Sequence, residues 1–283
     1  MDTINSTYKL ANGLEIPRLG FGTWQTPDGQ VAIDSVLAAF EAGYRHIDTA
    51  AAYNNEAGVG EAIRQSSLSR EEIFVTTKLW NSERGYEKTL AAFEVSMEKL
   101  GLEYLDLYLI HWPAAKGKAE DWQHTNSETW RAFEELYNQG RIKAIGVSNF
   151  MPHHLKPLME KAKVMPMVNQ IEFHPGLLQT QTTAFCADNN ILVEAWSPLG
   201  SGRLLEAKEL KAVAAKYDKS VAQICVRWCL QHGTLPLPKS VTPSRIKENA
   251  DVFDFEIGPE DMALIDALPD IGGSGLHPDE VNF

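Results

Sequence analysis

Short apolar runs alternate with amphipathic segments along the whole chain, and this alternation restricts the possible folds more than any other feature. Eight runs rich in β-branched and aromatic residues have the length of buried strands: 19–24, 45–50, 73–79, 105–111, 142–148, 168–174, 191–197 and 235–240. Segments of helical length separate them, among them 29–43, 86–101, 127–140 and 221–233. Alternating strands and helices predict a parallel α/β sheet, and eight repeats predict a (β/α)8 TIM barrel.

Two segments fall outside the alternation. Residues 7–20 contain Asn12-Gly13, the preferred pair of a type I′ turn, and predict an N-terminal β-hairpin that caps the bottom of the barrel. Residues 259–269 predict an extra C-terminal helix. Because no linker rich in Pro, Gly or Ser divides the chain, we expect residues 1–283 to form a single barrel domain.

Composition and charge exclude several classes of protein. The net charge of -12 repels polyanions, so nucleic acid is not expected as a partner. No segment approaches the roughly 18 uncharged apolar residues of a membrane span. The first residues lack a basic region followed by an apolar core, so the cytoplasm is the expected location. Cys225 and Cys229 lie four apart in a helical pattern, which predicts one buried face and not a disulfide framework.

Polar residues stand where seven of the eight predicted strands end, which in such a barrel is the active-site face. These residues are Asp48, Lys78, His111, Ser148, Asn149, Gln170, Glu172, His174, Ser197, Lys239 and Ser240. A buried ammonium such as Lys78 is costly unless it is paired, and Asp48 on the neighbouring strand can pair with it. Taken alone, these two residues fit a structural salt bridge equally well, and His111 alone fits a core histidine.

Tyr53, five residues after Asp48, changes this interpretation. A phenol has a pKa of about 10, but a nearby ammonium lowers the pKa and makes the phenol a more useful proton donor. Four ionisable groups on neighbouring strand ends favour an active site over separate structural roles.

Three long stretches carry a family resemblance: "DTAAAYNNEAGVGEAI" from residue 48, "LEYLDLYLIHWP" from residue 102 and "LPLPKSVTPSRIKEN" from residue 235. With "IGVSNF", "VNQIEFHP" and "EAWSPLG" between them, they resemble the aldo-keto reductase superfamily nearly end to end. The short chain is most similar to the bacterial branch of 2,5-diketo-D-gluconate and methylglyoxal-type reductases. The resemblance implies NADPH-dependent reduction of aldehydes and ketones, such as small dicarbonyls, keto-sugars or aromatic aldehydes, to alcohols.

The resemblance also assigns the catalytic roles. Asp48, Tyr53, Lys78 and His111 match the family's four catalytic positions. Hydride passes from the nicotinamide to the carbonyl carbon, and Tyr53 gives its proton to the oxygen. Lys78, held by Asp48, is expected to lower the tyrosine pKa, while His111 orients the carbonyl.

The implied contacts with the cofactor come from several strand ends. They are Gly22, Thr23, Ser148, Asn149, Gln170, Trp196, Ser197, Leu199, Gly200, Lys239, Ser240, Arg245, Glu248 and Asn249. Trp196, where the family more often has tyrosine, offers a face for stacking. Thr242 is the predicted N-cap and Pro243 the first residue of a helix. Lys239, Ser240 and Arg245 gather donors at this helix start, which suits a 2′-phosphate and favours NADPH over NADH.

Trp24, Trp80 and Trp112 match positions that wall the family's substrate pocket, although aromatic plugs of the core would explain them too. We expect the paired His153 and His154 to lie on the solvated surface.

Two other functions remain as alternatives. A metal-dependent barrel hydrolase could use Asp48, His111, Glu172 and His174 as ligands, but the first strand lacks the HxH pair of many such barrels. A cofactor-sensing module without activity would be favoured by a missing catalytic residue, and none is missing. We therefore expect a monomeric reductase of small carbonyl compounds that uses no metal.

Overall fold

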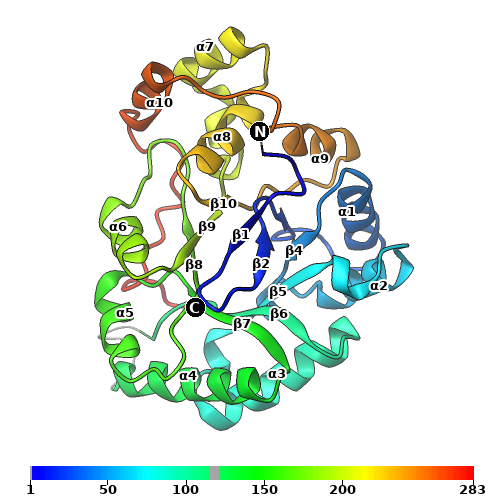
Figure 1. Ribbon diagram of the computed structural model, residues 1–283, viewed down its shortest axis with the longest axis vertical. Helices are drawn as coiled ribbons and strands as arrows, with labels where there is room; N and C mark the ends of the chain where they lie inside the picture. Colours follow the sequence, from blue (N-terminus) through cyan, green and yellow to red (C-terminus); the bar gives the residue numbers. More distant parts are fainter. Residues whose placement is uncertain (1, 115–120) are drawn as a thin grey trace.

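The computed structural model describes residues 2–114 and 121–283 and contains a parallel barrel ringed by helices (Figure 1). Each strand pairs with the next one in the sequence, in the order β3 to β10. The strands are β3 (Phe21–Gly22), β4 (His46–Asp48), β5 (Phe74–Leu79), β6 (Leu105–Ile110), β7 (Ile142–Ser148), β8 (Val168–Glu172), β9 (Leu192–Trp196) and β10 (Leu235–Pro236). All eight predicted strands are present, so the predicted (β/α)8 barrel is confirmed.

The barrel closes between its first and last strands. The N–H of Gly20 donates to the carbonyl of Pro236, and that of Gly22 donates to Pro238, each over 3.1 Å. A Cβ on Gly22 would lie 3.0 Å from the carbonyl oxygen of Leu237, so glycine permits this close approach. Because Pro236 and Pro238 have no N–H, they only accept hydrogen bonds here, and both closing strands are short.

Within the described ranges, at least one helix follows each strand of the barrel. The ring consists of α1 (Gln30–Glu41), α2 (Glu56–Gln65), α3 (Tyr86–Leu100), α4 (Trp122–Asn138), α5 (Pro152–Met159), α6 (Thr180–Asp188), α8 (Val221–Gln231) and α9 (Pro243–Ala250). Short 3₁₀ turns are η1 (Ala51–Tyr53), η2 (Arg70–Glu72), η3 (Asn81–Glu83) and η4 (Gly200–Glu206). Cys225 and Cys229 are both buried on α8, as expected. No helix in the described part of the chain is long and apolar enough to cross a membrane.

Two further helices pack together at one edge of the ring (Figure 1). The extra C-terminal helix was predicted and is α10 (Pro259–Asp266), whereas α7 (Lys208–Tyr217), between β9 and α8, was not predicted. The phenol of Tyr217 donates to Asp261 over 2.8 Å, and Lys216 pairs with the same carboxylate. These contacts fasten the chain after the barrel to the segment before its last strand.

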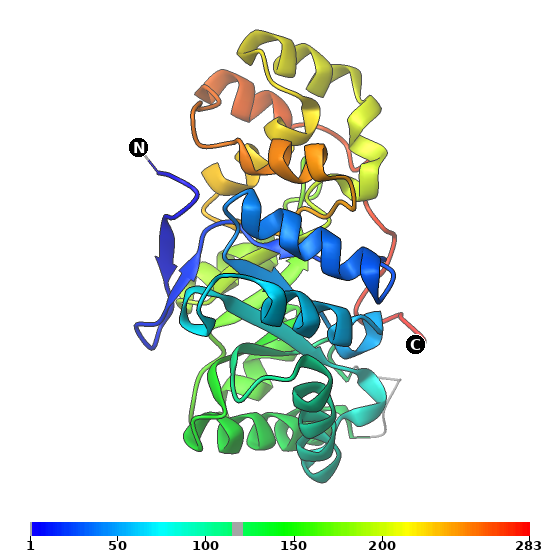
Figure 2. The same ribbon diagram turned by 90° about the vertical axis from the view of Figure 1, so that its right-hand side faces the viewer.

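The N-terminal hairpin covers one end of the barrel, as predicted. It consists of β1 (Thr7–Lys9) and β2 (Glu15–Pro17), which pair antiparallel. Leu10 and Ile16 are buried in one cluster with inward residues of the barrel strands. Tyr8 donates to the carbonyl of Thr234, just before β10. Figure 2 shows the hairpin and the C-terminal segment on opposite sides of the barrel.

The predicted type I′ turn of this hairpin is wrong. Such a turn needs positive φ at both central residues, but of the Asn12-Gly13 pair only Gly13 has it, at +88°. In the loop, the N–H of Gly13 donates to the carbonyl of Leu10, and the N–H of Leu10 donates to the carbonyl of Leu14. The reason is a tertiary contact, because the Asn12 amide donates to the carbonyl of Lys143 over 2.9 Å and accepts from the N–H of Leu14.

Alternate residues of each strand point into the barrel, and their character changes along its axis. Near the hairpin the interior is apolar, with Phe74, Leu107 and Leu235 in the cluster that includes Leu10 and Ile16. Toward the carboxyl ends of the strands it becomes polar, and this end carries the candidate site.

A close helix crossing gives a test of the packing around the barrel. A Cβ on Gly60 of α2 would lie 2.1 Å from the backbone oxygen of Leu100 at the end of α3, a contact that no side-chain rotation relieves. Gly60→Ala should therefore lower the free energy of unfolding by about 2 kcal/mol, as overpacking does elsewhere. Arg64→Ala, on the exposed face of the same helix, should change it by less than about 0.5 kcal/mol. Urea titration measures both, and a Gly60→Ala protein as stable as the wild type would contradict the close packing.

Candidate active site

The centre of the candidate site is a buried lysine. Nζ of Lys78, the penultimate residue of β5, lies 2.6 and 2.8 Å from the two carboxylate oxygens of Asp48, the last residue of β4. It also donates to the carbonyl of Thr49 over 2.9 Å and to the phenol oxygen of Tyr53 over 3.2 Å. The Lys78 side chain has no exposed surface, so these oxygens replace water around its charge.

The loop after β4 folds back and places Tyr53 beside the end of that strand. η1 turns the chain directly after Asp48, and Asn55 then fastens the turn. The Asn55 amide donates to the carbonyls of Thr23 and Thr26 over 2.9 and 3.0 Å and accepts from the hydroxyl of Thr49 over 2.7 Å. The loop is thereby tied to the end of β3, and the phenol faces the ammonium.

His111 completes the predicted group of four. It follows β6, and its ring meets the Tyr53 ring edge to face with centroids 5.6 Å apart. Burial, together with the charge of Lys78, holds the pKa of His111 well below its ordinary value, so the imidazole is neutral at pH 7. The structure brings all four predicted residues together at the carboxyl ends of neighbouring strands.

Lys78 lowers the pKa of Tyr53, as expected, but this is not the largest influence on the phenol. Burial raises the pKa of Tyr53 above its ordinary 10.0, and the charge of Lys78 offsets only part of that rise. For Lys78, burial lowers the pKa, but Asp48 and Tyr53 together raise it by more. At neutral pH the group therefore consists of a phenol, an ammonium and a neutral imidazole.

Four of the predicted cofactor residues form one hydrogen-bonded network beside His111. Ser148 donates to the carbonyl of Gln170 over 2.8 Å, and the Asn149 amide donates to the carbonyl of His111 over 3.0 Å. Nε1 of Trp196 donates to the side-chain oxygen of Asn149 over 2.8 Å. The Gln170 amide points into the barrel, where it donates to Asp48 over 2.9 Å. These side chains are fixed before any ligand binds.

The predicted residues at the end of β3 lie beside Asp48. Gly22 is one of the barrel-closing glycines. Both the N–H and the hydroxyl of Thr23 donate to the backbone oxygen of Asp48, over 3.0 and 2.9 Å. Thr23 thus joins the ends of β3 and β4.

The loop after β9 carries Ser197, Leu199 and Gly200, and it is packed against the C-terminal segment. Ser197 and Gly200 both have φ of 55°. A Cβ on Gly200 would lie 2.9 Å from Cα of Gly272, and Arg203 in η4 donates to the Gly272 carbonyl. The close approach explains the glycine at position 200.

The predicted phosphate site lies at the start of α9. Thr242 is the N-cap and Pro243 the first helical residue, as predicted, but the Thr242 hydroxyl makes no cap bond. Instead, Ser240 accepts the N–H of Thr242 over 3.1 Å, and Lys239 donates to the carbonyl of Gln25 over 3.2 Å. The first turn carries no acidic residue. The remaining predicted residues of this helix differ in burial: Arg245 is exposed, Glu248 half-buried and Asn249 buried.

The three predicted pocket tryptophans differ in their surroundings. Trp24 is 49% exposed at the rim. Trp80 stacks on Phe283 with ring centroids 5.7 Å apart, and the buried Trp112 meets the same ring edge to face at 5.3 Å. The carbonyl of Phe283 accepts the Asn81 amide over 2.9 Å. We define Trp80, Trp112 and Phe283 as the aromatic wall. Phe283 was not predicted, because nothing local to it indicates the contact.

Two buried polar residues below Asp48 were also missed. Glu194 accepts from the Gln170 amide over 2.7 Å, and His46 lies 4.0 Å from its other carboxylate oxygen. Both side chains are fully buried. A signal for Glu194 was present, because Leu192, Glu194 and Trp196 alternate along one face of a strand, which places an acid inside the barrel.

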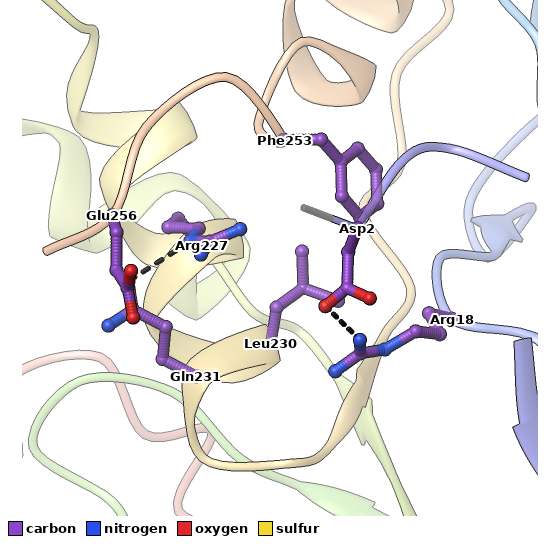
Figure 3. Close-up of a pocket in the computed structure, with 7 residues that line it drawn as sticks. All are labelled: Asp2, Arg18, Arg227, Leu230, Gln231, Phe253 and Glu256. Carbon is purple, nitrogen blue, oxygen red and sulfur yellow. Dashed lines mark hydrogen bonds and ion pairs between the residues drawn. The ribbon is translucent and has the colours of Figure 1, made fainter. Parts of the chain in front are cut away.

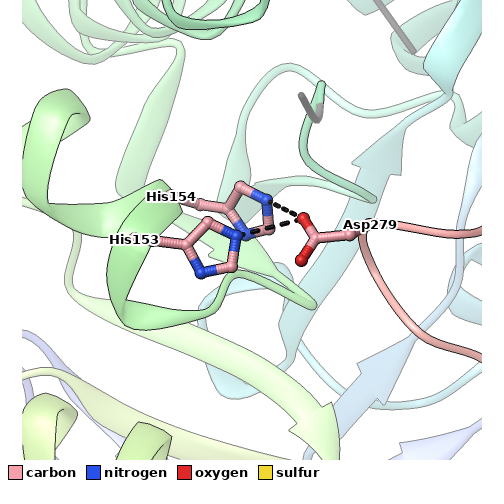
Figure 4. Close-up of side chains that lie close together, drawn as sticks. All are labelled: His153, His154 and Asp279. Atoms are coloured by element: carbon pink, nitrogen blue, oxygen red, sulfur yellow. Dashed lines mark hydrogen bonds and ion pairs between the residues drawn. The ribbon is translucent and has the colours of Figure 1, made fainter. Parts of the chain in front are cut away.

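The interpretation of His153 and His154 as solvated surface is wrong for His154, which is buried. Nε2 of His153 and of His154 lie 3.0 and 2.8 Å from one oxygen of Asp279 (Figure 4). Nδ1 of His154 accepts the N–H of Met151, so neutral His154 carries its proton on Nε2. The trio fastens the C-terminal segment to α5 and leaves no free lone pair on His154 for a metal.

The four ligands of the alternative metal site do not converge. Asp48 is occupied by Lys78, while Glu172 accepts from the N–H and hydroxyl of Ser274 over 2.8 and 2.6 Å. Nε2 of His174 lies 3.7 Å from Glu172. Across residues 2–114 and 121–283, the group of three potential metal ligands that lie close enough to share an ion consists of His153, His154 and Asp279.

A polar hollow lies at the other end of the barrel, beside the hairpin (Figure 3). Its lining residues are Asp2, Arg18, Arg227, Leu230, Gln231, Phe253 and Glu256. Arg18 pairs with Asp2, and Arg227 donates to the Gln231 amide oxygen over 3.0 Å. None of the predicted site residues lines it.

Comparisons with known proteins found a matching family model and similar sequences and structures. Residues 18–270 match the model of the Aldo/keto reductase family. The chain is 52% identical over 281 residues to glyoxal reductase of Bacillus subtilis, with 99% of each chain covered. It is 45% identical over 277 residues to methylglyoxal reductase DkgA of Escherichia coli, with 97% of each covered. The crystal structure of a Gox0644 variant in complex with NADPH superposes with a TM-score of 0.89, at 40% identity and 99% coverage of both chains.

The buried ion pair predicts a large effect of one substitution on stability. Asp48→Asn removes the negative charge that compensates Lys78 and should lower the free energy of unfolding at pH 7 by about 3 kcal/mol. Glu128→Gln breaks the exposed pair with Arg131 and should change it by less than about 0.5 kcal/mol. Urea titration distinguishes the two, and equal stabilities of both variants would show that the charge of Lys78 does not depend on Asp48.

Proposed function

The chain belongs to the aldo/keto reductase family, and on this premise we propose that it reduces small dicarbonyl compounds to alcohols with NADPH, using Tyr53 as the proton donor. The observation that carries the proposal is the bond from Lys78 Nζ to both Asp48 and the phenol of Tyr53. Relatives named glyoxal reductase and methylglyoxal reductase support small dicarbonyls as the substrate class. Keto-sugars and aromatic aldehydes are further candidate substrates.

Bound NADPH supplies the hydride, and the chain's own residues handle the proton. The raised pKa of Tyr53 keeps the phenol protonated at neutral pH, as a proton donor requires. When the phenol gives its proton to the substrate oxygen, the ammonium of Lys78, 3.2 Å away, stabilises the phenolate that forms. Asp48 keeps that ammonium in place.

His111 provides a second contact with the substrate oxygen. Its imidazole is neutral, so it can donate a hydrogen bond to the oxygen without adding a positive charge beside Lys78. The Asn149 amide holds the backbone oxygen of His111. The ring is thus positioned beside the phenol, where the carbonyl would accept from both.

The residues present fit a nicotinamide cofactor. The two N–H groups of the Gln170 amide are taken by Asp48 and Glu194, which leaves its oxygen to accept from a carboxamide. Trp196 is half-buried, and a bond to Asn149 holds its ring, so one face remains for stacking. The exposed Arg245, at a helix start without acidic residues, suits a 2′-phosphate.

The aromatic wall favours small substrates. Trp80 stands between His111 and Phe283, with ring centroids 5.2 Å from the imidazole. A flat apolar surface this close to the reacting group accommodates a short carbonyl compound and excludes a bulky one.

Turnover tests the proposal directly. Purified protein with NADPH and methylglyoxal, a keto-sugar acid or an aromatic aldehyde should lose the nicotinamide absorbance. Tyr53→Phe should lower kcat by at least about 100-fold and leave the Kd for NADPH within about twofold, because it removes the proton but not the ring. Tyr104→Phe is the matched control, since its buried hydroxyl has no partner. Unchanged turnover in Tyr53→Phe would refute the assigned role.

The choice of cofactor has a separate test. Arg245→Ala should raise the KM for NADPH roughly tenfold or more through the loss of a charge-assisted bond, and change the KM for NADH by less than about twofold. Lys247→Ala removes an exposed charge from the same helix and serves as the control for long-range attraction. Equal effects of Arg245→Ala on both cofactors would argue against a 2′-phosphate contact.

A further inference from the structure

A continuous column of polar side chains runs from the phenol of Tyr53 down the middle of the barrel. Lys78 and Asp48 form its upper part, and the Gln170 amide continues it by donating to Asp48 over 2.9 Å and to Glu194 over 2.7 Å. One amide nitrogen thus joins two carboxyl groups that come from β4 and β9. Below the half-buried Tyr53, the residues Lys78, Asp48, Gln170 and Glu194 are each at least 97% buried.

Elements on every side of Glu194 contribute groups that face it. β8 contributes Gln170, and β4 contributes Asp48 together with His46, whose Nε2 lies 4.0 Å from Oε1 of Glu194 and 2.9 Å from the Thr76 hydroxyl. β5 contributes the charge of Lys78, and β10 the apolar Leu235, which is paired in register with Glu194. Lys78 is already matched by Asp48, so a second carboxylate would leave the column with an uncompensated negative charge.

We infer that Glu194 is a positioning residue for the reaction: through Gln170 it fixes the amide beneath Asp48, and its own proton keeps the column neutral while Tyr53 transfers its proton. Oε2 accepts from Gln170, so the proton resides on Oε1, for which no hydrogen-bond partner is found among the described residues. Loss of this proton adds a negative charge to the column. That charge opposes the phenolate which forms on Tyr53, so proton transfer to the substrate slows.

Glu194 is the group of the column that titrates near neutrality. Burial, and then the charge of Asp48, raise its pKa to about 8. Burial and Lys78 lower the pKa of His46 to about 3, that of His111 lies well below 6.5, and that of Tyr53 is raised above 10.0. The rate between pH 7 and 9 therefore reports on Glu194.

This inference rests on the proposed reductase activity and is tested by the single-turnover rate of NADPH oxidation with methylglyoxal. Between pH 7 and pH 9 the wild-type rate should fall about tenfold, as expected for a required proton with a pKa of about 8. Glu194→Gln keeps an acceptor for Gln170 but cannot ionise, so its rate should change less than about twofold. Glu134→Gln, at a buried carboxyl of α4 that accepts the N–H groups of Lys163 and Val164, should behave as the wild type. Parallel pH profiles of wild type and Glu194→Gln would overturn the inference.

A second measurement separates failure of this inference from failure of the proposed function. If no carbonyl compound supports NADPH oxidation by the wild type at any pH, the reductase proposal fails. The pH dependence of unfolding then tests whether Glu194 carries a proton in the folded protein. Because the folded pKa is raised, the stability due to the protonated form is complete below pH 4.5 and is lost as pH rises through about 8. The wild type should therefore lose free energy of unfolding relative to Glu194→Gln over this range. A constant difference between the two proteins would overturn the inference.

Discussion

A lysine ammonium without exposed surface lies at the carboxyl end of β5, and the architecture of this face depends on compensating it. Two carboxylate oxygens, a backbone carbonyl and a phenol oxygen surround Nζ within 3.2 Å. Because these oxygens come from the end of β4 and from the loop after it, which includes η1, the loop must fold back toward Nζ to satisfy its charge. The energetic requirement to satisfy a buried cation and the requirement to place a phenol beside a substrate are met by the same contacts.

The rest of the interior adopts neutral forms around this one pair. Burial and the charge of Lys78 act in the same direction on His46 and His111, whose pKa values fall. They act in opposite directions on Tyr53 and Glu194, where burial prevails and both groups keep their protons. The site therefore combines a single ion pair with two acids that stay protonated at neutral pH. This arrangement suits a reaction that consumes a proton.

The strands, the hairpin and the C-terminal helix could be predicted because hydrophobic periodicity is local to each segment. The features that were missed depend on contacts between distant segments. Asn12 binds the backbone of β7, which replaced the expected turn, and His154 is covered by a segment more than a hundred residues away. The direction of the Tyr53 shift required the depth of burial, which no spacing reveals. Glu194 was visible as an acid in a strand, but its hydrogen bond with Gln170 was not.

The aromatic wall joins parts of the chain that are far apart in sequence, since Asn81 and Phe283 are separated by 202 positions. Contacts of such long range form late in folding, because a large loop must close before they contribute. Neighbouring strands need no such closure, but the contacts of Gly20 with Pro236 and of Gly22 with Pro238, which close the barrel, are of even longer range. Closure of the barrel and assembly of the wall therefore both depend on contacts between segments about 200 positions apart, so neither can be completed by local folding alone.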